Sequence, residues 1–262
     1  MAKKVKDLSK SHSIEEAKEL HVFKVSKRIF HQQKPLVVEL SNKSVVQFFN
    51  KASMIVTITM NPAVNKSSVG EKLIPEKRLR CSNLLAEAGR GGINVSKVIK
   101  KLCGESLAVF PAGGDNGELL KRILTKEKIS YKSIPVSAET RECFTVTDHS
   151  TNAQYRFVMP GAALMNKEIE NCFNSIYALQ PCPDIIVASG SLPSGVPDDF
   201  FARLAIIAKQ MGAKFIVDTS GIPLQLAAQE GVYLLKPNLS ELCSLIGKEY
   251  LQLNEVDEAA NK

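Results

Sequence analysis

From Met54 onward, short β-branched runs alternate with amphipathic segments, and this alternation restricts the possible folds more than any other feature of the chain. The runs predict strands at 54–60, 106–114, 184–191, 214–221 and 232–238. The amphipathic segments predict helices at 93–103, 116–128, 166–179, 197–211, 222–230 and 238–247. Such alternation is typical of an α/β fold with a mostly parallel sheet covered on both faces. Because right-handed crossovers connect such strands, the turns at their carboxyl ends gather at one edge, where ligands usually bind.

Two segments interrupt the alternation. Residues 67–82 and 142–159 show a period of two without an intervening helix, and the second predicts a hairpin that turns between His149 and Ala153. We therefore expect a separate small sheet.

Residues 1–53 differ from the rest of the chain. They contain no glycine, and their clusters PLVVEL and VVQFF are candidates for short strands. Ten lysines and one arginine stand against one aspartate and four glutamates, so this segment holds +6 of the total charge of +7. The remainder is almost neutral, and the basic segment lacks aromatic residues spaced for base stacking, so we expect no nucleic-acid partner. We treat 1–53 as a basic N-terminal extension of uncertain structure.

Hydropathy and cysteine usage limit the cellular setting. No run approaches the ~20 apolar residues that span a bilayer, so we expect no membrane association and a cytoplasmic location. The cysteines are scattered without a CxxC pair, and this pattern predicts reduced thiols rather than a zinc site or a disulfide framework. They are Cys81, Cys103, Cys143, Cys172, Cys182 and Cys243.

The stretch EAGRGGINVSKVIKKL, residues 87–102, places Gly89, Gly91 and Gly92 directly before a predicted helix. Glycines allow close backbone approach, and a helix start offers unpaired N–H groups to an anion. A tight turn before a helix explains the glycine spacing equally well. Asn94 could cap the helix or bind a ligand hydroxyl.

Other polar residues follow predicted strands, and each allows a structural reading beside a functional one. Asn238 and Glu241 in KPNLSEL could hold hydrated Mg²⁺, although their spacing by itself favours a capping box. Asp218 in VDTSG could face a ligand or cap a helix, and Asp115 in AGGDNGE is interpreted as a turn residue. Four arginines on or beside the period-two segments could be solvated or could contact a phosphorylated substrate, namely Arg78, Arg80, Arg141 and Arg156.

The order of these motifs is more specific than any one of them. Between residue 54 and about 250 the chain contains, in sequence, NPAVN, PEKRLRC, GRGGIN, FPAGGDNGE, QYRFVMPGAAL, SGSLPSG, VDTSG and KPNLSEL. This series resembles the PfkB, or ribokinase-like, carbohydrate kinases, and within them the PfkB-type 6-phosphofructokinases of bacteria. The resemblance implies that the γ-phosphoryl group of ATP is transferred, with Mg²⁺, to a sugar phosphate such as fructose 6-phosphate.

The resemblance also implies a fold and a set of site residues. It predicts a Rossmann-like domain over 54–262, with 67–82 and 142–159 as a β lid through which family members form homodimers. The residues implied to bind the sugar phosphate are Asn65, Gly91, Gly92, Asn94, Arg141 and Ser191. Those implied on the nucleotide side are Arg78, Lys236 and Asn238, with Glu241 and Asp218 beside the metal, so that Glu241 gains a role beyond the cap.

Three departures from the family pattern affect the expected activity. The family's catalytic aspartate lies in a GAGD motif that the sequence does not contain, so no catalytic residue is assigned and the kinase domain is expected to be incomplete. Asn65 stands where the family has aspartate, and Arg90 stands where it has glycine. The alternative to a phosphofructokinase is therefore an inactive remnant that at most binds sugar phosphate or a partner subunit.

Overall fold

The computed structural model of the chain describes residues 54–260. The basic segment 1–53, including its two candidate strands, lies outside the described residues. The described residues fall within one unit, Phe48–Lys262, that contains two sheets.

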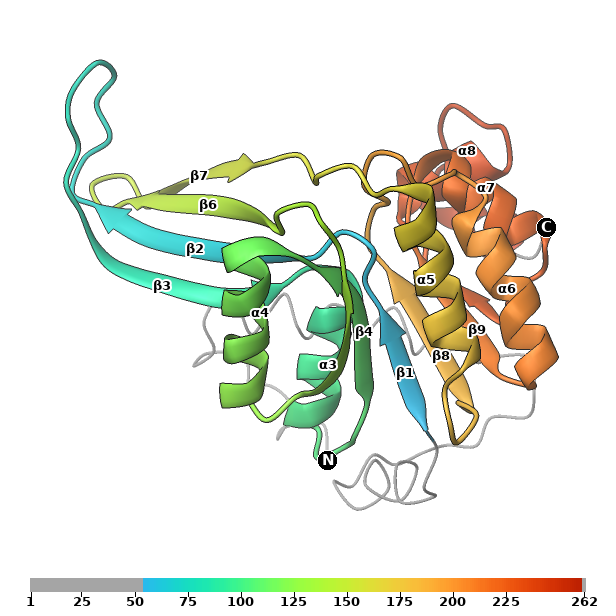
Figure 1. Cartoon of the computed structure of the whole chain (residues 1–262). Helices are drawn as coiled ribbons and strands as arrows, with labels where there is room; N and C mark the ends of the chain where they lie inside the picture. The colour runs from blue at the N-terminus through green and yellow to red at the C-terminus, as the bar shows by residue number, and fades with distance from the viewer. Residues whose placement is uncertain (1–53, 261–262) are drawn as a thin grey trace, which may run out of the picture. The chain divides into compact units, whose positions relative to one another are not determined.

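The larger sheet has six strands in the order β10-β9-β8-β1-β4-β5, and all neighbouring strands are parallel (Figure 1). This confirms the mostly parallel α/β fold. The strands are β1 (Ile55–Ile58), β4 (Leu107–Ala112), β5 (Ser130–Pro135), β8 (Ile185–Ser189), β9 (Lys214–Asp218) and β10 (Leu234–Leu235). The alternation of the sequence predicts five of them and misses β5, which lies at the edge of the sheet.

Helices cover both faces of this sheet because successive strand residues point to opposite sides. In β4, Val109 packs with residues of α5 and α6, whereas Ala108 and Phe110 pack with residues of α3 and α4. Each face thus has its own apolar core. The helices are α3 (Gly91–Lys101), α4 (Gly114–Lys126), α5 (Asn166–Tyr177), α6 (Phe200–Met211), α7 (Gly221–Gln229), α8 (Leu239–Leu245) and α9 (Val256–Ala259), with a 3₁₀ turn η2 (Leu253–Glu255).

The second sheet, which we call the lid, has four strands in the order β3-β2-β6-β7. It contains β2 (Ala63–Gly70), β3 (Cys81–Gly89), β6 (Arg141–Asp148) and β7 (Ala153–Val158). The expected small sheet is therefore present, and β6 and β7 form the expected hairpin. The carboxylate of Asp148 holds its turn by accepting N–H bonds from Ser150 and Thr151.

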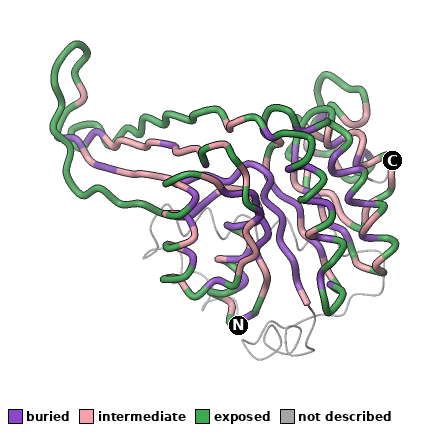
Figure 2. The backbone as a smooth tube through the Cα atoms, viewed as in Figure 1, coloured by how far each residue is buried: buried purple, intermediate pink, exposed green. Residues whose placement is uncertain are grey.

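Much of the lid is exposed, as Figure 2 shows by its green colour. Every described residue of β7 is exposed, and so are the first seven residues of β3. Residues 71–80 form no strand, so Arg78 and Arg80 lie on an exposed loop and not on the strand that the period-two pattern predicts.

The described residues also bear on membranes and cysteines. Between residues 54 and 260, no helix combines the length and the apolar character that a membrane span requires. All six cysteines are free thiols, three of them exposed and three buried. Burial raises the pKa of the Cys172 thiol to about 12, and the nearby Glu168 carboxylate adds to the rise.

Candidate active site

The candidate site forms where the parallel strands of the larger sheet end. β1, β8, β9 and β10 finish at their carboxyl ends with Ile58, Ser189, Asp218 and Leu235. The polar motifs predicted from the sequence directly follow these residues. The topology therefore brings the motifs to the edge of the sheet at which α/β proteins usually bind ligands.

The glycine turn before α3 packs against two of these strand ends. A Cβ added at Gly91 would lie 1.9 Å from the carbonyl oxygen of Ser189, and one added at Gly92 would lie 2.7 Å from the carbonyl oxygen of Ile58. Gly91 also has a φ of +46°, which glycine adopts most readily. These contacts require glycine at both positions and fix the start of α3 against the sheet.

Arg90 precedes these glycines as the N-cap residue of α3, with a φ of +83°. A side chain other than glycine is strained by about 1 kcal/mol in this region. Two further residues implied to bind sugar phosphate lie beside the same turn. The amide nitrogen of Asn65 would lie 2.2 Å, and the amide oxygen of Asn94 3.6 Å, from a Cβ added at Gly89.

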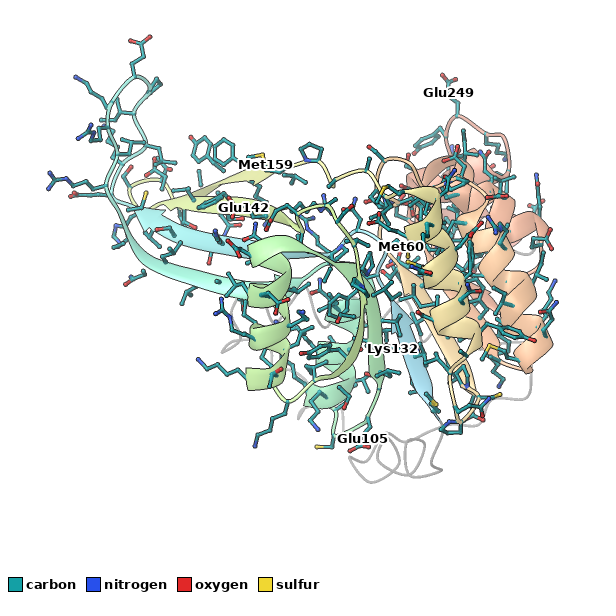
Figure 3. The ribbon with its side chains drawn as sticks, in the orientation of Figure 1. Met60, Glu105, Lys132, Glu142, Met159 and Glu249 are labelled. Atoms are coloured by element: carbon teal, nitrogen blue, oxygen red, sulfur yellow. The ribbon has the colours of Figure 1, made fainter. Side chains whose placement is uncertain are left out.

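Arg141, the first residue of β6, joins the lid to the end of β1. Its guanidinium donates hydrogen bonds of 3.0 Å to the carbonyl oxygens of Asn61 and Met159. Figure 3 labels Met159 on the lid and Met60, the residue before Asn61, beside the larger sheet. The side-chain amide of Asn61 donates in turn to the hydroxyl of Ser191 at 3.3 Å. Partial burial lowers the pKa of Arg141.

Sequence reasoning assigns no role to Asn61, yet Asn61 links Arg141 to Ser191. The sequence feature that could have indicated a role for Asn61 is its position, followed by Pro62, directly after the predicted apolar strand 54–60. Arg141 and Asn61 line one cleft together with residues of the lid base and the loop before α5. The structure thus brings Arg141 and Ser191 together, as the family resemblance implies.

A second group of polar side chains occupies the ends of β8, β9 and β10. The Lys236 ammonium lies 3.1 Å from one carboxylate oxygen of Asp218, and the Ser189 hydroxyl donates to the other at 3.0 Å. Lys236 and Asp218 are therefore neighbours, as expected. Since Ser189 also contacts the glycine turn, the two groups of side chains adjoin each other.

Asn238 and Glu241 form the capping box that their spacing favours. The Asn238 N–H donates to Glu241 at 2.7 Å, and the Glu241 N–H donates to the Asn238 side chain at 2.9 Å. Both residues line a cavity between α7 and α8. One Glu241 oxygen accepts in the cap, so the other oxygen has no part in the capping box.

The oxygen ligands available at this edge of the sheet fit a weakly held Mg²⁺ ion. Asp218 and Glu241 supply carboxylates, and Mg²⁺ in phosphoryl-transfer sites usually takes one or two carboxylates, with waters and substrate phosphates as its other ligands. Among residues 54–260, no cluster of three or more histidine, cysteine, aspartate or glutamate side chains is arranged to hold a metal by protein ligands alone.

Arg78 is the one predicted site residue that the described structure does not bring to this edge. It lies on the exposed loop between β2 and β3, at the end of the lid farthest from the larger sheet (Figure 1).

Comparison with known proteins places this geometry in a family. The profile of the pfkB family carbohydrate kinases matches residues 50–262. The chain is 40% identical over 208 residues to ATP-dependent 6-phosphofructokinase isozyme 2 of Mycobacterium tuberculosis. This alignment covers 79% of the chain and 61% of the relative, so the chain spans less than two thirds of that protein's length.

Solved structures agree with the sequence match. Phosphofructokinase-2 of Escherichia coli in complex with fructose-6-phosphate superposes with a TM-score of 0.76 at 37% identity, over 80% of this chain and 69% of that one. The tetrameric inhibited form of the same enzyme gives a TM-score of 0.75, with the same identity and coverage. Together with the family profile, which spans most of the sequence, these matches establish that the chain belongs to the pfkB family of carbohydrate kinases.

Proposed function

We propose that the chain takes part in the ATP-dependent phosphorylation of a sugar phosphate, with fructose 6-phosphate converted to fructose 1,6-bisphosphate. The proposal rests on one series of contacts between the two groups of polar side chains. The glycine turn packs on Ser189, the Ser189 hydroxyl donates to Asp218, and Asp218 pairs with Lys236. A turn suited to a sugar phosphate is thus linked by three contacts, through Ser189 and Asp218, to a lysine suited to a nucleotide.

On the sugar-phosphate side, Arg141 supplies positive charge and Ser191 a hydroxyl. The amides of Asn65 and Asn94 lie beside Gly89, where they can hydrogen-bond sugar hydroxyls. A neutral amide at position 65 accepts weaker hydrogen bonds than a carboxylate would. The names of the relatives support fructose 6-phosphate as the sugar phosphate, since one relative is a 6-phosphofructokinase and one structure contains this sugar phosphate.

On the nucleotide side, Lys236 and Asn238 would contact ATP phosphates, and Asp218 and Glu241 would hold Mg²⁺ through water. Mg²⁺ bound with ATP neutralises charge on the transferred phosphoryl group. The protein's part is to hold the two reactants in line, which is the main contribution of protein residues in phosphoryl transfer. Arg78, on the lid loop, would reach a phosphate only at a site other than the one in its own chain.

A second function is favoured by the sequence itself. No GAGD motif occurs in the 262 residues, and both carboxylate oxygens of Asp218 are already in contact with protein groups, one with the Lys236 ammonium and the other with the Ser189 hydroxyl. We therefore propose that residues 54–262 form part of a kinase domain, and that the 262-residue polypeptide by itself binds sugar phosphate without transferring phosphate to it.

Binding and turnover are tested separately on the 262-residue chain. Calorimetric titration with fructose 6-phosphate, fructose 1-phosphate and tagatose 6-phosphate measures binding, and a coupled assay for ADP release with Mg²⁺ and ATP measures turnover. Binding of fructose 6-phosphate without turnover supports the second function, and turnover supports the first. If none of the three sugar phosphates binds, both functions are refuted.

We also propose that two copies associate through their lids. Large apolar side chains are exposed on β3 and β7, with Leu84 66%, Leu85 61%, Phe157 51% and Val158 55% accessible. By the strand register, Leu84 shares one face of the lid with Phe157, and Leu85 shares the other face with Val158. Exposed apolar side chains on a sheet are typical of a protein contact. The tetrameric form of the Escherichia coli enzyme shows that a relative assembles from several copies.

A cytoplasmic location is proposed on the basis of the thiols. Cys81, Cys103 and Cys182 are exposed and unpaired, which suits a reducing compartment better than an oxidising one.

A further inference from the structure

Two arginine side chains flank the start of β2 at the base of the lid. Ala63, the first residue of β2, is paired with Gly89 of β3 on one side and with Arg141 of β6 on the other. Arg90 directly follows Gly89. Because neighbouring strands lie about 4.8 Å apart, this register places Arg90 and Arg141 one strand away from Ala63 on either side. They come from segments that are 51 positions apart in the sequence.

Both guanidinium groups contain a polar atom that lacks a partner. The Nε–H groups of Arg90 and Arg141 are buried and donate to no hydrogen-bond acceptor among the described residues. Within residues 54–260, neither arginine takes part in an ion pair, and the Arg141 guanidinium donates to the neutral carbonyl oxygens of Asn61 and Met159. Buried hydrogen-bond donors in proteins are nearly always bonded. Two unbonded Nε–H groups on neighbouring arginines are therefore what a binding site for an anion would present.

The two cations also act on each other. Burial lowers the pKa of Arg141 most, the nearby Cys143 opposes this effect, and the charge of Arg90 lowers the pKa further. The acidic residue that lines the cleft is Glu139; its carboxylate accepts the Asn116 N–H at 2.7 Å and forms no ion pair with either arginine. Among the described residues, neither of the two positive charges is therefore matched by an ion pair with a carboxylate.

Arg90 is held in a backbone conformation that disfavours it. Its φ of +83° lies in the left-handed region, where glycine would be unstrained. Strained residues persist where surrounding structure holds them, and they are frequent at ligand sites. Here the strained residue carries a charge close enough to Arg141 to lower the pKa of Arg141.

We propose that Arg90 and Arg141 together bind one phosphate monoester, and that Arg90 thereby makes the site select a phosphorylated sugar over the free sugar. Two guanidinium groups offer planar sets of N–H donors that match phosphate oxygens. A dianion between them satisfies both Nε atoms and removes the repulsion. The identity of the monoester, fructose 6-phosphate, rests on the proposed function, but the pairing of the arginines does not.

The experiment compares the full 262-residue chain with its R90G variant. Calorimetry measures the affinities for fructose 6-phosphate, for inorganic phosphate and for fructose, and thermal unfolding measures the stability without ligand. We expect R90G to bind fructose 6-phosphate and inorganic phosphate at least ~10-fold more weakly, because one charged hydrogen-bonding partner is lost. Fructose affinity should not change, and the unliganded variant should unfold at the same or a higher temperature, since glycine removes the strain at this φ.

Two further variants serve as controls. R90Q keeps most of the side-chain length without the charge, so it should lose phosphate affinity like R90G even if R90G changes the turn. R122A removes an exposed arginine on α4 and should leave every affinity unchanged. Weaker phosphate binding with greater stability is a combination that a purely structural role of Arg90 does not produce.

The outcomes separate this inference from the proposed function. If both R90G and R90Q bind fructose 6-phosphate as tightly as the wild-type chain or more tightly, the inference is refuted and the proposed function survives. Tighter binding by the variants would indicate that Arg90 obstructs the site. If the wild-type chain binds inorganic phosphate through Arg90 but has no preference for fructose 6-phosphate, the arginine site stands and the proposed substrate is wrong. If the wild-type chain binds neither anion, the arginine site is refuted.

Discussion

Replacing Gly91 with alanine tests whether the glycine turn must lie against the sheet. The added Cβ would be 1.9 Å from the Ser189 carbonyl oxygen and 2.7 Å from its carbonyl carbon. Both atoms belong to backbone that is fixed in β8, so no flexible side chain can move aside. To reach a separation of 3.0 Å, the turn and the strand must move apart by about 1.1 Å.

The expected loss of stability in G91A has two parts. Alanine at a φ of +46° costs about 1–2 kcal/mol. Forcing one extra carbon into a packed position costs a further ~1–3 kcal/mol. The free energy of unfolding should therefore fall by about 2–5 kcal/mol. The same ~1 Å displacement would move the start of α3 away from the end of β8, so sugar-phosphate binding at this turn should weaken.

G212A is a matched control for the backbone part of this cost. Gly212 has a φ of +71°, and a Cβ added there meets no atom within 4 Å. Thermal unfolding followed by circular dichroism should place the midpoint of G91A ~2–10 °C below that of G212A, given a difference of ~1–3 kcal/mol. Equal midpoints, together with unchanged fructose 6-phosphate affinity of G91A by calorimetry, would refute the close packing of the turn.

Three further predictions concern other parts of the molecule. The double variant L84D/F157D, which changes two exposed side chains on the same face of the lid, should convert a lid-mediated dimer to monomers in light scattering. Y250D, at a side chain 71% exposed outside the lid, should not, and a monomeric wild-type chain contradicts the lid contact. K236A should weaken binding of a fluorescent ATP analogue. It should change the free energy of unfolding by less than about 1 kcal/mol, because the ion pair between Lys236 and Asp218 is partly exposed. A loss of ~3 kcal/mol with unchanged nucleotide binding would instead assign Lys236 a structural role. The pKa of the buried Cys172 thiol is about 12, above that of an unfolded thiol, so its stabilising effect is complete below the unfolded pKa of ~8.5 and is lost as pH rises above it. The stability difference between wild type and C172A in denaturant titrations should therefore narrow between pH 8 and 10.5, and a constant difference would contradict the burial of this thiol.

The main features of the fold were predictable because strand burial leaves a strong local pattern. IVTI in β1 and IIVAS in β8 are apolar because helices cover both faces of the central strands. SYKSIP in β5 has one fully buried residue, so its sequence carries little strand signal, and only the backbone pairing with β4 defines it. Edge strands of this kind depend on tertiary contacts that no short window contains.

The candidate site was less predictable because its residues act through contacts between distant segments. Glycine spacing alone left the turn at Gly91 ambiguous, and only its distance to Ser189 shows why glycine is needed. Asn61 was missed because its role depends on Arg141, 80 positions later. For Glu241, the local spacing correctly indicates the capping box, whereas its proposed role beside a metal comes from the family.

Arg141 has a mechanical consequence beyond its charge. Its hydrogen bonds to Met159 on the lid and to Asn61 at the end of β1 make one guanidinium group a joint between two sheets. An anion that binds the remaining donors must compete with, or align with, that joint. Substrate binding and the position of the lid relative to the larger sheet would then be thermodynamically coupled. A partner that fixes the lid would alter the affinity for substrate without contacting the substrate.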